Sequence, residues 1–181
     1  MIVLASASPR RAELMSLLTD KFIIVPADVD EATSSSHPAD IVMDIAILKA
    51  KSVARSYPCD TVIGADTIVY YNARALGKPK SEQEAIAYLT ELRGKVHCVY
   101  TGVCVIKGGR QYCCYERSEV VIRELSDSEI LSYVKGGSPM DKAGAYGIQD
   151  GVVQSYKGSY ENIVGLPTFL ISGVPAIAEE I

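Results

Sequence analysis

The opening residues constrain the fold most, because they place a short apolar strand directly before a well-marked helix start. Residues 3–5 have the composition of a buried strand. Ser8 and Pro9 follow, and they are the residue types favoured at the cap and at the first position of a helix. The apolar residues 22–25 then predict the next strand. The chain therefore opens as a strand, a helix and a second strand.

The first turn of this predicted helix carries charges of the unusual sign. Arg10 and Arg11 stand where free backbone N–H groups and the helix dipole favour acidic side chains. One interpretation is a pair of solvated arginines. The other is an anion site, in which the N–H groups, the dipole and both guanidinium groups bind a phosphate. Taken alone, the pair leaves both interpretations open.

The other expected elements follow from apolar periodicity, capping boxes and glycine turns. They are a helix over about 39–57, a strand over 61–71 interrupted at 64–66, helices from Ser81 through Leu92 and from Ser126 through Val134, strands over 97–106 and 111–125 turned at 108–109, loop or short strand over 136–167, and a bent or broken helix from about 167. No repeat or linker separates independent parts. We expect a single domain over residues 1–181.

Composition narrows the classes of function. The 181 residues are 48% apolar, which is typical of a folded protein, and 18 basic residues against 22 acidic ones give a net charge of −4. Without a general basic field, we expect no polymeric nucleic acid partner, and any bound anion must be held by a local cluster of cations.

Cysteine usage and hydropathy predict the compartment. The five cysteines form no CxxC pair and only two histidines accompany them, so we expect reduced thiols rather than a zinc site. The chain shows no signal peptide pattern and no apolar window of ~20 residues. We therefore expect a cytoplasmic protein without a membrane segment.

Two further segments carry candidate functional residues. Asp66 stands between apolar residues at the end or wall of a sheet, where burial requires a cation, a metal or a proton as its partner. Lys78 lies between Gly77 and Pro79, and a backbone-restrained lysine suits a point contact to phosphate. Lys80 is expected to be an ordinary charged turn residue.

For the remaining polar residues, spacing alone does not decide. Lys49 taken alone is an ordinary surface lysine, and Glu31 is either a loop acid or a second metal ligand. His97 at a strand start is expected to be structural. Tyr146 and Tyr160 either stack on a base or cover the core, and we favour the core.

The ordered motifs of the chain resemble those of the Maf family of nucleotide pyrophosphatases. The motifs are "LASASPRRAEL" at 4–14, "DVDE" at 28–31, "KAKSVA" at 49–54, "GADTIV" at 64–69, "GKP" at 77–79, "DKAGAYGIQ" at 141–149 and "GSYENIVGLP" at 158–167. They cover nearly the whole chain. The resemblance implies an α/β fold of two lobes around a deep cleft, with a mixed twisted sheet flanked by helices. It also implies hydrolysis between the α and β phosphates of a nucleoside triphosphate with a divalent cation, Mg²⁺, Mn²⁺ or Co²⁺.

The resemblance also implies roles for single residues. Asp66 would accept the proton of the attacking water and bind the metal, and Glu31 would be a second metal ligand. Arg10, Arg11, Lys49 and Lys78 would neutralise the triphosphate, while Ser8 would cap the helix and contact phosphate. Phosphoryl chemistry depends on such positioning and neutralisation.

Three positions concern the choice of base. By resemblance, Arg10, Thr67 and Gln149 match members that act on dTTP and UTP rather than on 7-methyl-GTP, and an amide can pair with O4 and N3–H of uracil or thymine. The chain departs from the family after Gln149, where Asp150 replaces the usual glycine. Alternatives are a 7-methyl-GTP enzyme, or a nucleotide-binding regulator of cell division with little turnover. The sequence leaves homodimerisation and the preferred metal open.

Overall fold

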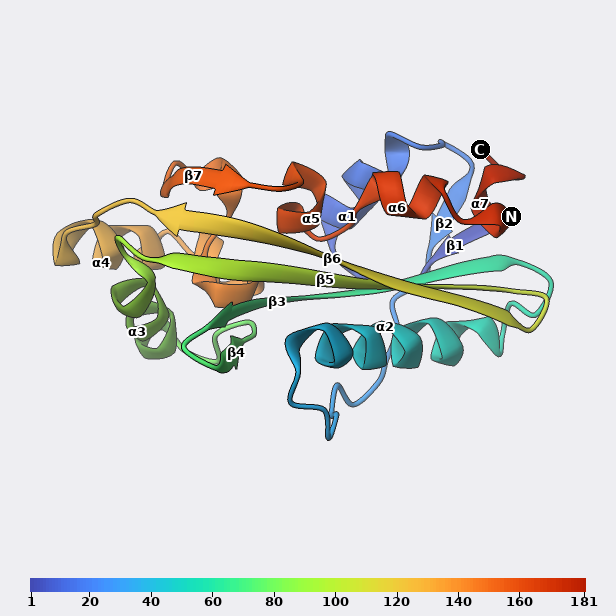
Figure 1. Cartoon of the computed structure of the whole chain (residues 1–181), viewed down its shortest axis with the longest axis horizontal. Helices are drawn as coiled ribbons and strands as arrows, with labels where there is room; N and C mark the ends of the chain where they lie inside the picture. The colour runs from blue at the N-terminus through green and yellow to red at the C-terminus, as the bar shows by residue number, and fades with distance from the viewer. The chain divides into compact units, whose positions relative to one another are not determined.

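The computed structural model describes all residues, 1–181, as a mixed seven-stranded sheet flanked by helices (Figure 1). The strand order is β2-β1-β3-β5-β6-β7, with β4 paired to β3. The strands are β1 (Ile2–Leu4), β2 (Phe22–Ile24), β3 (Thr61–Tyr71), β4 (Arg74–Leu76), β5 (Val96–Lys107), β6 (Arg110–Ile122) and β7 (Val153–Lys157). The helices are α1 (Pro9–Ser16), α2 (Pro38–Ala54), α3 (Glu82–Leu92), α4 (Asp127–Lys135), α5 (Tyr160–Val164), α6 (Thr168–Ser172) and α7 (Pro175–Ala178). The expected α/β class with a mixed sheet is confirmed.

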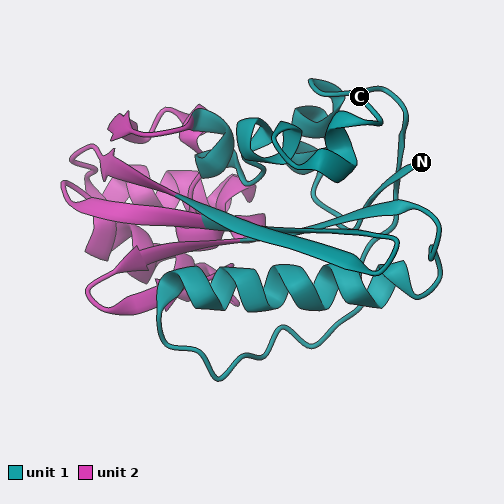
Figure 2. Ribbon diagram, turned by 45° about the vertical axis from the view of Figure 1, so that its right-hand side comes forward, with its two compact units in different colours: residues 1–66, 101–116, 160–181 teal, residues 67–100, 117–159 magenta.

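The chain forms two compact units (Figure 2). Unit 1 comprises Met1–Asp66, Thr101–Glu116 and Tyr160–Ile181, and unit 2 comprises Thr67–Tyr100 and Arg117–Ser159. Three strands, β3, β5 and β6, contribute residues to both units. No helix in the chain combines the length and apolarity needed to span a membrane.

The core of unit 1 has two apolar layers, one on each face of its strands. Ile2, Leu4 and Ile63 belong to one cluster, whereas Val3 and Val62 belong to the other, as the alternation of side chains along a strand requires. The first cluster includes apolar side chains of α1, α6 and α7, and the second includes those of α2. In Figure 1, α2 lies on the opposite side of the strands from α1, α6 and α7. Parallel pairing of β1 with β2 and with β3 holds the strands in register.

Helix α2 approaches the sheet unusually closely at two glycines. A Cβ atom at Gly64 would lie 2.4 Å from the carbonyl oxygen of Ala46, and one at Gly102 would lie 2.5 Å from that of Val42. The predicted interruption of the strand at residues 64–66 is therefore wrong: β3 runs unbroken, and its glycine serves helix packing.

Helix starts agree with their sequence signals to different degrees. The Ser8 side chain accepts a hydrogen bond from the Arg11 backbone, and Pro9 is the first residue of α1. Ser126 and Glu129 form the reciprocal capping box at α4. At α3 only Ser81 acts as a cap, because the Glu84 carboxylate instead accepts from the Lys80 backbone N–H at 2.6 Å.

Strands β5 and β6 form the predicted hairpin. Gly108 and Gly109 connect them with φ of 56° and 77°, the left-handed conformation that a two-residue hairpin turn requires. The last helical segment is broken, as expected, because α6 ends before Gly173 and α7 begins at Pro175.

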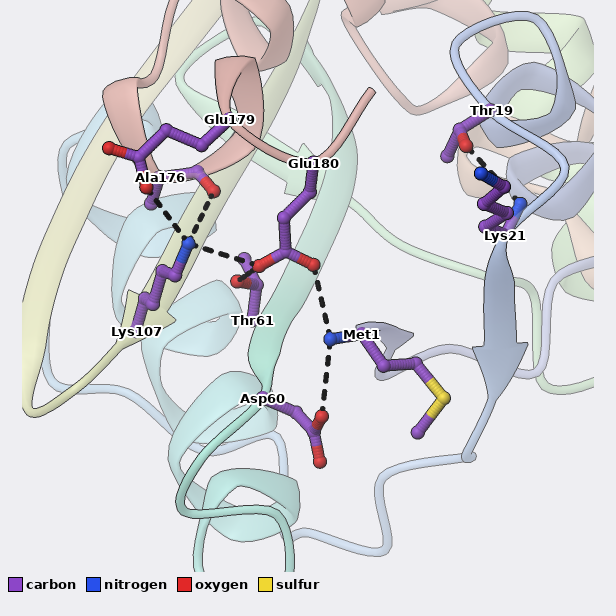
Figure 3. A network of polar contacts seen from close by, with 9 residues as sticks. All are labelled: Met1, Thr19, Lys21, Asp60, Thr61, Lys107, Ala176, Glu179 and Glu180. Atoms are coloured by element: carbon purple, nitrogen blue, oxygen red, sulfur yellow. Dashed lines mark hydrogen bonds and ion pairs between the residues drawn. The ribbon is translucent and has the colours of Figure 1, made fainter.

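The C-terminal segment of unit 1 is held by charges (Figure 3). Glu180 accepts a short hydrogen bond from Thr61 and forms an ion pair with Lys107 at 3.1 Å. The Met1 ammonium lies 3.2 Å from Glu180 and 3.3 Å from Asp60. These contacts attach the residues after α7 to the start of β3 and the end of β5.

Unit 2 has its own core. Helices α3 and α4 pack against each other and bury Leu89, Leu92, Ile130 and Val134. Strand β7 pairs antiparallel with β6. The segment expected to be loop or short strand contains three short 3₁₀ turns, over Ser138–Asp141, Ala143–Ala145 and Ile148–Asp150, before β7 begins.

Candidate functional site

Asp66 lies on the face of β3 that packs against α2. It shares this face with Val62 and Gly64, since side chains alternate along a strand. On α2, Lys49 lies about one turn after Ala46 and directly before Ala50, and its ammonium group reaches Asp66. As whole residues, Asp66 and Lys49 are 7% and 9% exposed, and the Lys49 Nζ to Asp66 Oδ1 distance is 2.8 Å. The cation that burial of Asp66 demands is thus Lys49.

A second carboxylate completes this cluster. Glu31, from the segment between β2 and α2, places Oε1 2.8 Å from the same Lys49 ammonium. Its side chain is 54% exposed, so it forms the open side of the cluster. Lys49 therefore bridges a buried and an accessible acid, and of the two interpretations left open by the sequence, the ordinary surface lysine is excluded.

Opposing effects set the charge of Asp66. Burial raises the pKa of this carboxyl group, while the charges of Lys49 and Arg11 lower it, and the net shift is upward. Burial likewise lowers the pKa of the Arg11 guanidinium, and the charges of Asp66 and Glu31 oppose this effect. Arg11 and Asp66 are thus electrostatic neighbours. A carboxylate more basic than usual can accept a proton from water.

The start of α1 directs Arg11 back into unit 1. Its Nε donates to the Gly165 carbonyl at 2.8 Å, and a terminal nitrogen donates to Ser6 Oγ at 3.3 Å. Its backbone N–H donates to Ser8 Oγ at 3.4 Å. Interpretation as a solvated side chain is therefore wrong for Arg11. Arg10 is half-buried beside it, and its charge contributes to the lowered pKa of Arg11.

Sequence reasoning missed two of these contacts. The Arg11 guanidinium is held by Ser6, five residues earlier in the chain, and by Gly165, 154 residues later. Ser6 is buried, and it lies in the "LASASPRR" motif without having been assigned a role. The contact with Gly165 has no local signal because it spans 154 residues, whereas Ser6 stands in the same motif as Arg11.

The carboxylates of Asp66 and Glu31 fit a divalent cation. Both are hard oxygen donors, and each lies 2.8 Å from one nitrogen, so their oxygens are no farther apart than twice that distance. Mg²⁺ is typically bound by one or two carboxylates together with phosphate and water. The chain has no group of three acidic, histidine or cysteine side chains arranged to hold a metal.

Three candidate residues belong to unit 2. Thr67 continues β3, Lys78 is exposed in the loop between β4 and α3, and Gln149 is exposed in the 3₁₀ turn Ile148–Asp150. Lys80 acts as expected, in a turn, where its backbone N–H donates to Glu84.

The aromatic residues divide between structure and surface. His97 Nε2 lies 2.6 Å from the Tyr146 hydroxyl, and both side chains are buried. Burial lowers the pKa of His97 to about 4, which keeps the ring neutral near pH 7 and agrees with a structural role. Tyr146 lies in the core as predicted, but Tyr160 is 41% exposed, so its expected place in the core is wrong.

Fold and site together define a class: an α/β protein in which an arginine-bearing helix start faces a buried acid–lysine pair. The particular family follows from comparison with known sequences. The family model described as "Maf-like protein" matches residues 1–174. The chain belongs to this family.

Two similar curated proteins carry the same name. The "dTTP/UTP pyrophosphatase" of Bacillus cereus (strain G9842) is 48% identical over 170 residues, which cover 92% of this chain and 89% of the relative. The protein of the same name from Bacillus mycoides (strain KBAB4) is also 48% identical over 170 residues, with the same coverage. Among solved structures, the Ham1 protein of Staphylococcus aureus matches with a TM-score of 0.48 and 19% identity, over 67% of this chain and 71% of that one.

Proposed function

We propose that this chain is a nucleoside triphosphate pyrophosphatase that hydrolyses dTTP and UTP to the monophosphate and pyrophosphate. Membership in the Maf-like family and the name of two curated relatives, dTTP/UTP pyrophosphatase, support the reaction and the substrates. We also propose that the protein acts in the cytoplasm.

The observation that carries the proposal is the buried Asp66 carboxylate with its raised pKa, paired with Lys49 and electrostatically coupled to Arg11. In the proposed reaction, Asp66 takes a proton from a water molecule that attacks one of the two phosphorus atoms joined by the oxygen between the α and β phosphates. The bond from this phosphorus to the bridging oxygen then breaks, and the monophosphate and pyrophosphate separate. A site that only bound phosphate would gain nothing from a carboxylate, because the two anions repel each other.

Cations of the site have separate proposed tasks. Arg11, held by Ser6 and Gly165, is positioned before substrate arrives, and a fixed guanidinium suits a phosphate oxygen. Arg10 and Lys78 add charge from less buried positions. Ser8 keeps the helix start ordered and offers a hydroxyl to phosphate.

Asp66 and Glu31 would hold the divalent ion, Mg²⁺, Mn²⁺ or Co²⁺. When bound, such an ion neutralises phosphate charge and polarises the reacting phosphoryl group. Lys49 now pairs with both carboxylates, so we expect it to exchange one of them for phosphate when substrate and metal bind.

Specificity is assigned to Arg10, Thr67 and Gln149. The Gln149 amide is exposed and offers a donor and an acceptor to the O4 and N3–H edge of uracil or thymine. We therefore expect dTTP and UTP to be preferred to 7-methyl-GTP.

Substitution of Asp66 by asparagine tests the catalytic proposal. Asp66→Asn keeps the size of the side chain but removes the basic oxygen, so we expect pyrophosphate release to fall by about 10²–10⁴-fold. Nucleotide binding, measured by calorimetry, should persist. Asp40→Asn is the matched control, because this exposed aspartate begins the same helix that bears Lys49. Unchanged turnover in Asp66→Asn would exclude Asp66 as the proton acceptor.

A substrate panel tests the remaining alternatives. Wild-type protein is assayed for pyrophosphate release from dTTP, UTP and 7-methyl-GTP, each with Mg²⁺, Mn²⁺ and Co²⁺. Preference for 7-methyl-GTP would overturn the proposed specificity. Tight binding without turnover under every condition would instead indicate a nucleotide-binding regulator.

A further inference from the structure

The turn that carries Gln149 is tied down at both ends within unit 2. On one side, the Gly147 backbone N–H donates to the Tyr133 hydroxyl at 3.1 Å. On the other side, Arg123 Nε donates to the Gly151 carbonyl at 3.1 Å. The turn itself is closed by a hydrogen bond from the Asp150 N–H to the Gly147 carbonyl at 3.1 Å. Gln149 is therefore an exposed side chain on a restrained backbone.

Asp150 connects this turn to the surrounding elements. Its Oδ2 atom accepts hydrogen bonds from the Tyr133 hydroxyl at 2.5 Å and from Ser138 Oγ at 2.9 Å. Tyr133 belongs to α4 and binds the Gly147 N–H with the same hydroxyl. One phenolic group thus bridges the backbone two residues before Gln149 and the side chain one residue after it.

The charge of Asp150 is balanced by a buried lysine. Lys142 is 9% exposed, and its Nζ lies 4.0 Å from Asp150 Oδ2 and 3.0 Å from Asp141 Oδ1. The same ammonium donates to the Ser138 carbonyl at 2.5 Å. The Asp150 carboxylate therefore accepts from two hydroxyl groups and lies near a buried cation, unlike an aspartate that only contacts solvent.

Space around the carboxylate is also limited. A Cβ atom at Gly147 would lie 2.8 Å from Asp150 Oδ2 and 2.9 Å from Lys142 Cε. The backbone of Gly147 has φ of −112°, a conformation open to any residue. Glycine is therefore needed at position 147 to leave room for the Asp150 carboxylate, and not because of its backbone conformation.

We propose that Asp150 is a positioning residue for base selection, because its carboxylate joins Tyr133, Ser138 and Lys142 into a support that fixes the turn bearing Gln149. This inference rests on the proposed function. The Gln149 amide discriminates between bases only if it lies at a fixed distance from the base edge, and the backbone of the turn sets where this side chain begins. Asp150 supplies that restraint through its contacts with Tyr133 and Ser138.

The test measures selectivity rather than activity alone. The ratio of kcat/KM for UTP to that for CTP is compared between wild type and Asp150→Ala, together with the melting temperature. We expect the ratio to fall about tenfold, mainly through a higher KM for UTP. Asp127→Ala is the matched control, since Asp127 is an exposed carboxylate on α4 paired with Arg93, and its ratio should stay within about twofold of wild type.

Three more variants separate positioning from folding. Asp150→Asn keeps an oxygen that accepts from Tyr133 and Ser138, so it should restore most of the ratio. Tyr133→Phe removes the bridge and should lower the ratio, without adding to the effect of Asp150→Ala. Gly147→Ala retains every polar group but displaces the carboxylate, so it too should lower the ratio, even if Asp150→Ala fails to fold.

The results distinguish this inference from the proposed function. An unchanged ratio in folded Asp150→Ala or Gly147→Ala, or an equal loss for both substrates, would overturn the positioning role. If wild type shows no turnover, the proposed function fails, and the Kd ratio for UTP against CTP then decides the role of Asp150 by the same criterion. A wild type that neither hydrolyses nor binds these nucleotides would overturn both.

Discussion

Replacement of Gly64 by alanine would insert one methyl group between β3 and α2. The new Cβ would lie 2.4 Å from the Ala46 carbonyl oxygen and 2.7 Å from the Ala50 nitrogen, whereas ordinary contact begins at 3.4 Å. Both obstructing atoms belong to the helix backbone, so no side chain can turn away. Helix α2 must therefore move from the strand by about 1 Å, because a close-packed interior has no free space.

Two losses follow from this displacement. Overpacking of a core typically costs about 1–3 kcal/mol, and we expect the free energy of unfolding to fall by that amount. Lys49 on α2 would also be displaced from Asp66 on β3, whose charged atoms are now 2.8 Å apart. Because a misplacement of ~1 Å can reduce a rate by about 10²-fold, kcat/KM for pyrophosphate release should fall by about that factor.

Urea denaturation followed by circular dichroism measures the first loss, and pyrophosphate release from UTP measures the second. Gly173→Ala is the control, since its Cβ would have no heavy atom closer than 3.5 Å. It should change neither quantity appreciably. If Gly64→Ala matched wild type in both stability and kcat/KM, the close approach of α2 would not be what places Lys49 beside Asp66.

Other predictions concern charges and caps. Lys49→Met removes the largest charge that lowers the pKa of Asp66, so the acid limb of the kcat/KM–pH profile should move to higher pH; a limb at the wild-type pH would contradict this. Because the pKa of Asp66 is higher in the folded than in the unfolded protein, the protonated carboxyl group stabilises the fold below the unfolded-state pKa, and this stabilisation is lost as the pH rises through the folded-state pKa. Without Lys49 the folded-state pKa is raised more, so urea titrations of Lys49→Met should show a larger fall in the free energy of unfolding over this pH range. Ser8→Ala should cost about 0.5–1 kcal/mol in the same assay, since its cap hydrogen bond is 3.4 Å long. Burial raises the pKa of Glu180, but its hydrogen bonds and the facing Lys107 lower this pKa by more, so the net shift is downward. Glu180→Gln should therefore lower the free energy of unfolding by about 1 kcal/mol at pH 7, and the difference from wild type should vanish once the pH falls below the folded-state pKa. A difference that does not depend on pH would refute this.

Local signals in the sequence predicted local structure well. Ser8 with Pro9, Ser126 with Glu129, and the pair Gly108–Gly109 each act within a few residues, and the structure has a helix start or a turn at each. The α/β class and the mixed sheet likewise agree with the motif resemblance. The caps and the glycine turn depend on backbone preferences that a short segment already contains.

Long-range packing was not predictable in the same way. Gly64 interrupts an apolar strand pattern, and only the neighbouring helix backbone explains it. Lys49 has no local mark of burial, since its partner Asp66 is 17 residues away. Tyr160 stands in an aromatic and apolar stretch, yet its side chain is exposed because α5 has only five residues and buries Asn162 and Ile163 instead. Sequence spacing carries no information about such partners.

The division of strands between the two units has a consequence for synthesis. The chain passes from one unit to the other four times, at residues 66, 100, 116 and 159, so neither unit is a continuous stretch of sequence. Leu166, Ile171 and Ile177 complete the apolar cluster begun by Ile2 and Leu4. A ribosome must therefore deliver almost the entire polypeptide before the first strand finds all its neighbours, and nascent intermediates with an open apolar face should be clients for chaperones.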